Sequence, residues 1–330
     1  MDKTLKKIRG AEVLVTGGAG FIGSNLVEKL VKSGAKVTVV DLLLEPYGGN
    51  KFNLEKVRKK IHLVKGDVRT KELMRKLVKE KDFIFHLAAQ TGRTISLSDP
   101  FLDLSINLAG TLNVLESVRE NKNRAKIIFS SSRGVIGKPI YLPVNEAHPA
   151  NPRDIYAANK LSAENYFKIY QQEFGTRSTI LRLNNVYGPK CQVRSNHYGT
   201  VNLFIKYALS KEILPIYGNG KQTRDYIYID DVVSALILAA DEKADEETFF
   251  VGSGNEISLV EIAKTIKKYI GDTEYKLVPY PDSLVVMDFD KFYSTSKKIN
   301  KHLNWKSTIP FEEGIKRTIK YYKKYLSFYL

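Results

Sequence analysis

Short apolar runs alternate with longer amphipathic stretches through the first 188 residues of the chain. The apolar runs, each typical of a buried strand, lie at residues 11–18, 35–41, 60–67, 82–89, 125–132 and 178–188. Stretches with helical periodicity separate them, at residues 20–34, 70–80 and 106–122. Strand and helix in alternation favour βαβ units, in which helices cover both faces of a parallel sheet. We therefore expect an α/β fold built on a doubly wound parallel sheet.

The alternation ends near residue 188, which predicts a second structural unit. Residues 191–199 are typical of a loop, and residues 311–325 are typical of a helix. We predict a first domain over residues 1–188 and a smaller, interleaved α/β lobe over residues 189–330. The segment at about 221–250 is expected to return to the first domain.

Length and cysteine content narrow the class of protein. A chain of 330 residues can bury a sizeable core, and none of its apolar runs reaches the ~18 residues of a membrane span. Its one cysteine, Cys191, excludes an internal disulfide. The charged N-terminal residues lack the apolar segment of a signal peptide. We expect a cytoplasmic protein without membrane contact.

The formal net charge of +16 raises the question of an anionic partner. The lysines are spread along the whole chain, with no sustained basic block or arginine-rich arm. This distribution is typical of a solvated surface, so we do not expect binding to nucleic acid. A small anionic substrate needs only a few of these charges.

A glycine-rich loop, VTGGAGFIGSN, follows the first predicted strand and opens the first predicted helix. Gly17, Gly20 and Gly23 let the backbone turn tightly and let a pyrophosphate approach the unpaired N–H groups of the helix N-terminus. Asp41 closes the second strand, where a carboxylate can hold ribose hydroxyls, and no arginine follows to bind a 2′-phosphate. The pattern predicts a Rossmann-type domain that binds NAD rather than NADP.

A tyrosine and a lysine spaced four residues apart point to proton transfer. Tyr156 and Lys160, in YAANK, fall on one face of a predicted helix. The lysine ammonium can stabilise the tyrosine phenolate, which makes the tyrosine a general base. Ser132, at the end of a buried strand that finishes in three serines, can orient a substrate alcohol. We predict Ser132, Tyr156 and Lys160 as the catalytic residues and predict no metal site.

These motifs resemble the extended short-chain dehydrogenase/reductase family, in its NAD-dependent nucleotide-sugar epimerase/dehydratase branch. The resemblance covers nearly the whole chain and lies in TGGAGFIGSN, HLAAQ, NLAGTLNVLE, SSS, YAANK, LRLNNVYGP and GNGKQTRDYIYIDDVV. It implies NAD in the first domain, a nucleotide diphosphate-sugar in the second lobe, and a homodimer joined through helices near residues 100–120 and 154–173.

The resemblance also implies which residues contact each ligand. The cofactor-binding set comprises Gly17, Gly20, Phe21, Ile22, Asp41, Asp67, Val68, Leu87, Ala88, Ala89, Thr91, Asn107, Tyr156 and Lys160. The substrate-binding set comprises Ser132, Asn185, Asn202, Arg224 and Phe292. Of these, Asn185 and Arg224 match positions that hold the sugar-nucleotide diphosphate, accompanied by Asp225.

The two residues that directly follow Ser132 bear on the type of reaction. Dehydratases of the family place an Asp-Glu pair there, because eliminating water needs an acid and a base. Decarboxylases usually keep a glutamate, whereas this chain has Arg133 and Gly134. We therefore interpret the chain as a nucleotide-sugar epimerase. The preferred hypothesis is a UDP-hexose 4-epimerase that interconverts UDP-glucose and UDP-galactose through a transient 4-keto sugar.

The chain departs from the epimerase pattern at several positions. Val285 stands where a second diphosphate arginine is usual, Thr295 where an aspartate is usual and Ile136 where a tyrosine is usual. Candidate replacement cations are Lys190, Arg194 and Lys291. Phe292 aligns beside the sugar C2 substituent, where a bulky ring excludes an N-acetyl group, which predicts a preference for the non-acetylated sugars.

Four alternatives stay open at this point. The chain is also compatible with a CDP-sugar 2-epimerase, an N-acetylhexosamine 4-epimerase or a non-catalytic NAD-binding protein. The fourth is a uronic acid 4-epimerase, in which Arg133 or Arg194 would bind the sugar carboxylate.

Overall fold

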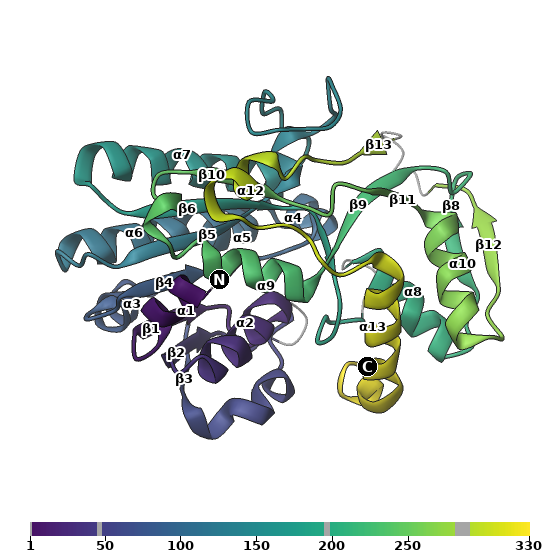
Figure 1. The fold of residues 1–330 in the computed structure, drawn as a ribbon, viewed down its shortest axis with the longest axis horizontal. Coiled ribbons are helices and arrows are strands. Elements are labelled where there is room, and N and C mark those ends of the chain that lie inside the picture. Colours follow the sequence, from purple (N-terminus) through teal and green to yellow (C-terminus); the bar gives the residue numbers. More distant parts are fainter. Residues whose placement is uncertain (1, 45–47, 195–198, 281–290) are drawn as a thin grey trace.

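The computed structural model describes residues 2–44, 48–194, 199–280 and 291–330. Seven strands of the described chain form one parallel sheet in the order β10-β6-β5-β4-β1-β2-β3 (Figure 1). Their bounds are β1 Glu12–Thr16, β2 Lys36–Asp41, β3 Ile61–Lys65, β4 Phe83–His86, β5 Lys126–Ser132, β6 Ser178–Leu183 and β10 Thr248–Val251. On one side of β1 the sheet continues with β2 and β3, and on the other side it continues with β4, β5, β6 and β10. Doubly wound sheets bind their ligands at such a switch point, which here lies between β1 and β4.

Side chains that alternate along these strands fill two separate cores, one on each face of the sheet. Val13 and Val15 of β1 belong to the core beneath α2 and α9, whereas Leu14 belongs to the core beneath α3, α6 and α7. Each fully buried aliphatic side chain contributes roughly 1.5–3 kcal/mol relative to an exposed one. The expected α/β fold with a doubly wound parallel sheet is confirmed.

A first group of α-helices lies on the large sheet or against the helices that cover it. Their bounds are α1 Asp2–Ile8, α2 Phe21–Lys32, α3 Lys71–Val78, α4 Arg93–Ser98, α5 Pro100–Leu104, α6 Gly110–Glu120, α7 Ile155–Phe174, α9 Ile229–Leu238 and α12 Lys297–Leu303. In α7 the Asp154 side chain accepts a hydrogen bond from the Ala157 N–H, and Gly175 ends the helix in the left-handed conformation. These caps fix where α7, which carries Tyr156 and Lys160, begins and ends.

A second lobe lies beyond the carboxyl ends of the strands (Figure 1). Its helices are α8 Thr200–Leu209, α10 Leu259–Ile270 and α13 Phe311–Tyr325, and its strands are β7 Asn185–Tyr187, β8 Leu214–Tyr217, β9 Thr223–Tyr228, β11 Glu256–Ser258, β12 Tyr275–Val278 and β13 Lys291–Phe292. Strand β9 pairs with β7, β11 and β13, and β8 pairs with β12. Between the two lobe strands β9 and β11, the chain returns to the large sheet as α9 and β10.

The stretch predicted as one strand at residues 178–188 is two strands. Strand β6 ends at Leu183, and β7 starts at Asn185 in the sheet of the second lobe. Asn184, between them, is buried and donates hydrogen bonds to Asp225 and Ser294. Apolar residues occur in both strands, so the sequence pattern alone does not reveal the change of sheet.

The C-terminal residues close back onto the first domain. The Phe328 ring stacks on Phe52 with centroids 3.8 Å apart, and the Tyr329 hydroxyl donates to Asn53. Asn53 in turn donates to the Ala19 carbonyl in the glycine-rich loop. In the described part of the chain, no helix has the length and apolar character needed to cross a bilayer.

Candidate active site

The glycine-rich loop, which lines a cavity, packs too closely against the chain for a side chain at two of its glycines. Gly17 has φ +69° and lies so close to the end of β4 that a Cβ atom would approach the Ala88 backbone to 2.8 Å. At Gly23 a Cβ atom would meet the Gly17 carbonyl oxygen at 2.2 Å. Helix α2 begins directly after Gly20, so its free N–H groups and positive dipole end point into this space. The loop therefore fits a dinucleotide pyrophosphate.

Asp41 ends β2 beside this loop. Its carboxylate accepts hydrogen bonds from the Ala19 N–H at 2.9 Å and from the Leu43 N–H at 2.8 Å. Burial raises the pKa of Asp41, although those backbone donors oppose the shift. The carboxylate is therefore positioned by the backbone at the cavity wall, where ribose hydroxyls can donate to it.

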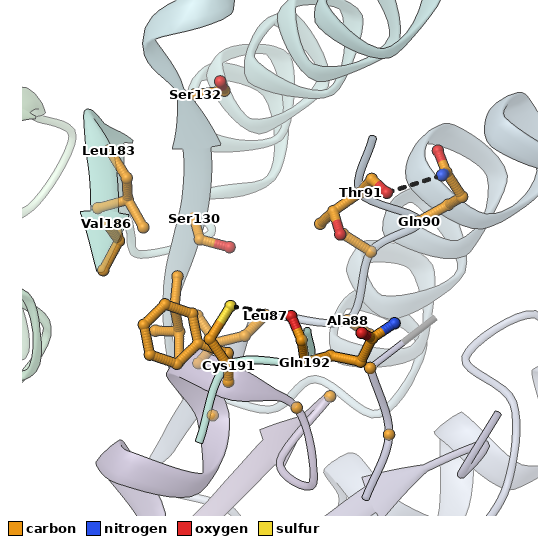
Figure 2. Close-up of a pocket in the computed structure, with 18 of the residues that line it drawn as sticks. Leu87, Ala88, Gln90, Thr91, Ser130, Ser132, Leu183, Val186, Cys191 and Gln192 are labelled. Atoms are coloured by element: carbon orange, nitrogen blue, oxygen red, sulfur yellow. Dashed lines mark hydrogen bonds between the residues drawn. The ribbon is translucent and has the colours of Figure 1, made fainter. Parts of the chain in front are cut away.

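A cavity of about 400 Å³ extends from the glycine-rich loop to the end of β5. The predicted cofactor-binding residues that line it are Gly17, Gly20, Phe21, Ile22, Asp41, Asp67, Val68, Leu87, Ala88, Ala89, Thr91, Tyr156 and Lys160. Figure 2 shows Ser130 and Ser132 on one wall, with Thr91 and Ala88 across the cavity from them. Asn107 lies behind this wall, where its side-chain amide donates to the Gln90 carbonyl.

Buried hydrogen bonds fix the wall that β4 contributes. The Thr16 hydroxyl accepts from the N–H groups of Leu87 and Ala88, both at 3.1 Å, and bonds to His86 Nδ1 at 2.8 Å. His86 Nε2 bonds to the Thr111 hydroxyl at 3.0 Å. Burial, with a contribution from the Lys160 charge, lowers the pKa of His86 to about 3. The imidazole is therefore neutral at ordinary pH and holds β1, β4 and α6 together.

The three serines at the end of β5 point alternately to the two faces of the sheet. Ser131 donates to the Glu164 carboxylate at 2.5 Å, and Arg182 completes a buried ion pair with Glu164 at 2.7 Å. Ser130 and Ser132 share the opposite side, which faces the cavity (Figure 2). The Ser132 hydroxyl accepts from the Gly134 N–H at 3.0 Å, which anchors the turn after the strand.

Tyr156 and Lys160 lie one turn apart on α7 and meet Ser132 at the cavity. The Ser132 hydroxyl lies beside the Tyr156 phenol and acts to lower its pKa. Burial, reinforced by Asp103 and Asp154, raises the pKa of Tyr156 well above its usual range. Burial also lowers the pKa of Lys160 to about 7, and its ammonium lies over the Phe129 ring at 4.3 Å. Because both groups are desolvated, the charge of one strongly affects the other.

Two buried polar residues behind this pair were absent from the sequence prediction. Asn159 of α7 donates to Asp103 of α5 at 2.7 Å, and burial raises the pKa of Asp103. Residues Ser105–Ala109, which follow α5, form a single π-helical turn. Such turns are frequent at functional sites, and this one turns Ile106 into the cofactor cavity. Asp103, an acid within the otherwise apolar helix α5, was the one signal in the sequence that could have indicated the buried pair of Asn159 and Asp103.

A second cavity, of about 330 Å³, meets the first at Ser132, Tyr156 and residues 183–185. Its wall includes Asn185 of β7 and Arg224 of β9, as the sequence predicted for substrate contacts. Along β9 the next residue, Asp225, faces the other way and accepts hydrogen bonds from Ser253, Gly254 and Asn184. Arg224 is therefore presented to the cavity while Asp225 anchors the strand.

Two residues predicted to contact the substrate lie elsewhere. Asn202 is buried and bonds to the Gly188 backbone and the Tyr322 hydroxyl, so it joins α8 to the loop after β7. Phe292 is fully buried with Val135 and Ile136, because β13 pairs with β9 and turns the ring into a small core. In the described part of the chain, neither residue lines either cavity. The contact of Phe292 with an N-acetyl group therefore stays a prediction.

The candidate replacement cations are also distributed away from the second cavity. Lys190 pairs with Glu28 at 2.6 Å, Lys291 lies 3.8 Å from Glu256, and Arg194 donates to the Leu330 carbonyl. Position 285 lies outside the described residues. The cations that do line the second cavity besides Arg224 are Arg93, Arg133 and Arg153.

The family model described as GDP-mannose 4,6 dehydratase matches residues 14–318. The chain belongs to that family. A putative UDP-glucose 4-epimerase from Methanocaldococcus jannaschii is 38% identical over 94% of this chain and 98% of its own length. The structure of a UDP-glucose 4-epimerase from Thermotoga maritima with UDP-glucose has a TM-score of 0.89 at 34% identity, over 96% of this chain and 99% of that chain. A UDP-glucose 4-epimerase from Thermus thermophilus in complex with NAD has a TM-score of 0.85 at 32% identity, over 94% and 99%.

The family places this site among the NAD-dependent nucleotide-sugar epimerases, dehydratases and decarboxylases of the extended short-chain dehydrogenase/reductase type. The expected family and the expected cofactor, NAD, are thereby confirmed. The observed loop, with no room for a Cβ atom at Gly17 or Gly23 and with Asp41 beside it, fits that cofactor. Relatives of the family also include proteins named as uronate decarboxylases and as a dehydratase.

Proposed function

We propose that this protein is an NAD-dependent UDP-hexose 4-epimerase that interconverts UDP-glucose and UDP-galactose. One observation carries the proposal: Ser132 and Tyr156 lie where the cofactor cavity opens into a second cavity, in which Asp154 is the single lining carboxylate among the described residues. That carboxylate caps α7 by accepting from the Ala157 N–H at 2.7 Å. Eliminating water needs an additional acid and base at the sugar. Epimerisation at one carbon needs only residues that orient the hydroxyl and take and return its proton, which are the roles of Ser132, Tyr156 and Lys160.

In the proposed mechanism the chain handles the proton of the sugar 4-hydroxyl. Ser132 orients that hydroxyl, and the Tyr156 phenolate accepts its proton, while the Lys160 ammonium stabilises the phenolate. NAD, held by the glycine-rich loop and Asp41, supplies reversible hydride acceptance at C4. Because desolvation raises the pKa of Tyr156, the phenolate forms only when positive charge is close to it.

Inversion requires the sugar to present its other face while the nucleotide stays bound. Asn185 lies where the two cavities meet, whereas Arg224 of β9 lines only the second cavity. A charged contact from Arg224 to the diphosphate would hold the nucleotide and leave the hexose free to turn. Tyr156 then returns the proton to the new 4-hydroxyl.

We also propose a homodimer joined through α4, α5 and α7. Large apolar side chains are exposed there in the single chain, notably Phe101, which is 81% exposed, with Leu97, Leu104 and Ile169. Large exposed apolar side chains gathered on neighbouring helices are typical of interaction surfaces. Because α7 carries Tyr156, such an interface would rigidify the catalytic helix.

The proposed function is tested by incubating the purified protein with UDP-glucose and following UDP-galactose by chromatography. We expect conversion to an equilibrium mixture from either side, without loss of water or CO₂. CDP-sugars and UDP-N-acetylhexosamines in the same assay test the alternative substrates. Formation of a 4-keto-6-deoxy sugar or a pentose, or no turnover of any nucleotide sugar, would contradict the proposal.

A further inference from the structure

Three segments that are distant in the sequence meet at one buried side chain, that of Asn53. This residue lies in the 3₁₀ helix η2, Lys51–Lys60, and is 1% exposed. Its side-chain nitrogen donates to the Ala19 carbonyl at 2.9 Å and to the Lys190 carbonyl at 3.3 Å. Its side-chain oxygen accepts from the Tyr329 hydroxyl at 2.6 Å. Asn53 therefore joins the glycine-rich loop, the loop after β7 and the C-terminal residues.

Two of these segments are walls of the cofactor cavity. Ala19 directly precedes Gly20, and Lys190 directly precedes Cys191. Both Gly20 and Cys191 line the cavity, and Figure 2 shows Cys191 on its wall. The Asn53 side chain thus ties the wall that fits the pyrophosphate to a wall that the loop after β7 contributes.

Further hydrogen bonds reinforce the same connection. The Lys190 ammonium donates to the Asn53 carbonyl at 2.8 Å and pairs with Glu28 of α2 at 2.6 Å. Asn25, also of α2, donates to the Pro189 carbonyl at 3.1 Å. Because Lys190 is buried, its bonds are stronger than the same bonds in water. The loop after β7 is therefore fastened to the helix whose N-terminus points into the cofactor cavity.

Helix α13 and the residues after it hold this junction. The Tyr322 hydroxyl donates to the Cys191 carbonyl, and the rings of Tyr322 and Tyr329 pack edge to face with centroids 5.5 Å apart. Both tyrosines are buried. The Phe328 carbonyl accepts from the Asn50 side chain at 2.9 Å. The C-terminal residues therefore contact one cavity wall directly and the other through the segment that includes Asn50 and Asn53.

We propose that Tyr322 and Tyr329 are positioning residues of the cofactor site, which fasten its two walls together and slow the release of NAD. Separating the walls breaks the hydrogen bonds of Asn53 and Lys190. The Tyr329 hydroxyl keeps the Asn53 amide turned toward both carbonyls, so it makes that separation slower. The inference rests on NAD binding and does not depend on the identity of the sugar.

The first test measures the release of NAD in the absence of any sugar nucleotide. The full-length protein is loaded with radiolabelled NAD, unlabelled NAD is added in excess, and the label that stays with the protein is followed over time. Tyr329→Phe removes only the hydroxyl that Asn53 accepts from, and should release NAD roughly tenfold faster, because a buried acceptor loses its donor. Tyr322→Phe should also release NAD faster, since the Cys191 carbonyl loses its donor.

Wild-type release rates in both variants would overturn the proposal. Because the assay contains no sugar nucleotide, its result is independent of whether the protein proves to be an epimerase.

Two control variants separate a positioning role from a contribution to overall stability. Tyr170→Phe loses a hydrogen bond from a tyrosine hydroxyl to Glu116, on the other face of the large sheet. Tyr325→Phe loses a hydroxyl that makes no hydrogen bond within the described part of the chain. Both should release NAD at the wild-type rate, even where the unfolding temperature falls. If Tyr170→Phe accelerated release as much as Tyr329→Phe, overall stability would set the rate and the proposal would be wrong.

The last test asks whether Tyr329 acts through Asn53. Asn53→Ala should release NAD at least as fast as Tyr329→Phe, because it loses the bonds to both cavity walls. The double variant should then release NAD no faster than Asn53→Ala alone. A double variant whose acceleration is the product of the two single effects would show that the residues act independently, and would overturn the assignment of Tyr329.

Discussion

The hydroxyl of Ser132, at the end of β5, lies beside the phenol of Tyr156, in the first turn of α7, and acts to lower the pKa of that phenol against the effect of burial. The pair lies where the cofactor cavity and the second cavity meet. Lys160, one turn further along α7, completes a set in which one residue orients a hydroxyl, one takes its proton and one stabilises the resulting charge.

Replacing Tyr156 with Phe should lower kcat by a factor of about 10²–10⁴, because the ring remains and only the proton-transfer group is lost. NAD should stay bound, as judged by the absorbance of nucleotide released on denaturation. Tyr166→Phe, on the same helix and partly buried against its core, is the matched control and should retain activity. Wild-type rates in the Tyr156 variant would remove Tyr156 from the mechanism.

Asp41→Ala should weaken NAD binding by roughly 1.5–3 kcal/mol, since ribose hydroxyls lose a charged acceptor. The Ala19 N–H loses its partner as well, which loosens the glycine-rich loop. Titration calorimetry with NAD and NADP measures both effects. The wild type should discriminate strongly against NADP, and equal affinity for the two cofactors would show that Asp41 does not face the ribose.

The large sheet was predictable because each of its first strands is a continuous apolar run next to a helical period. Strands β8, β9, β11, β12 and β13 were not predicted, since they do not follow the regular alternation of strand and helix and pair with partners distant in the sequence. The division of 178–188 at Asn184 has the same cause: only the pairing of β7 with β9, which is distant in the sequence, separates the two halves.

The catalytic set was predictable because its residues carry unusual chemistry at fixed spacing along local motifs. Arg93 and Arg153, in contrast, resemble the many other surface cations of a chain with net charge +16, and only the fold brings them to one cavity. Phe292 shows the opposite case: the sequence predicted this ring for the sugar pocket, and the pairing of β13 with β9 places it in a small core.

His86 should make the protein less stable in mild acid. Its pKa is about 3 when folded and 6.5 by reference, so the unfolded chain binds more protons between these values. The free energy of unfolding should therefore fall as pH decreases from 6.5 toward 3, by at most about 1.4 kcal/mol per pH unit from this residue. Urea unfolding of the wild type and of His86→Gln across this range measures it. The variant should show a smaller slope, and identical slopes would contradict a buried, neutral imidazole.

Light scattering at micromolar concentration should give the mass of a dimer. Phe101→Glu places a charge in the proposed interface and should yield a monomer with the secondary structure unchanged in circular dichroism. Ile140→Glu is a suitable control, because Ile140 is 76% exposed on a loop outside the three interface helices. A monomeric wild type, or a dimer unaffected by the Phe101 change, would count against the interface.

We propose that C4 is inverted by removal and return of the same hydride within one active site. The most direct measurement uses UDP-glucose deuterated at C4, with the product analysed by NMR and mass spectrometry in ordinary water. We expect inversion at C4 with the deuterium retained at C4 and no added NAD consumed. Inverted product that has lost its deuterium to solvent, or product altered at a carbon other than C4, would contradict it.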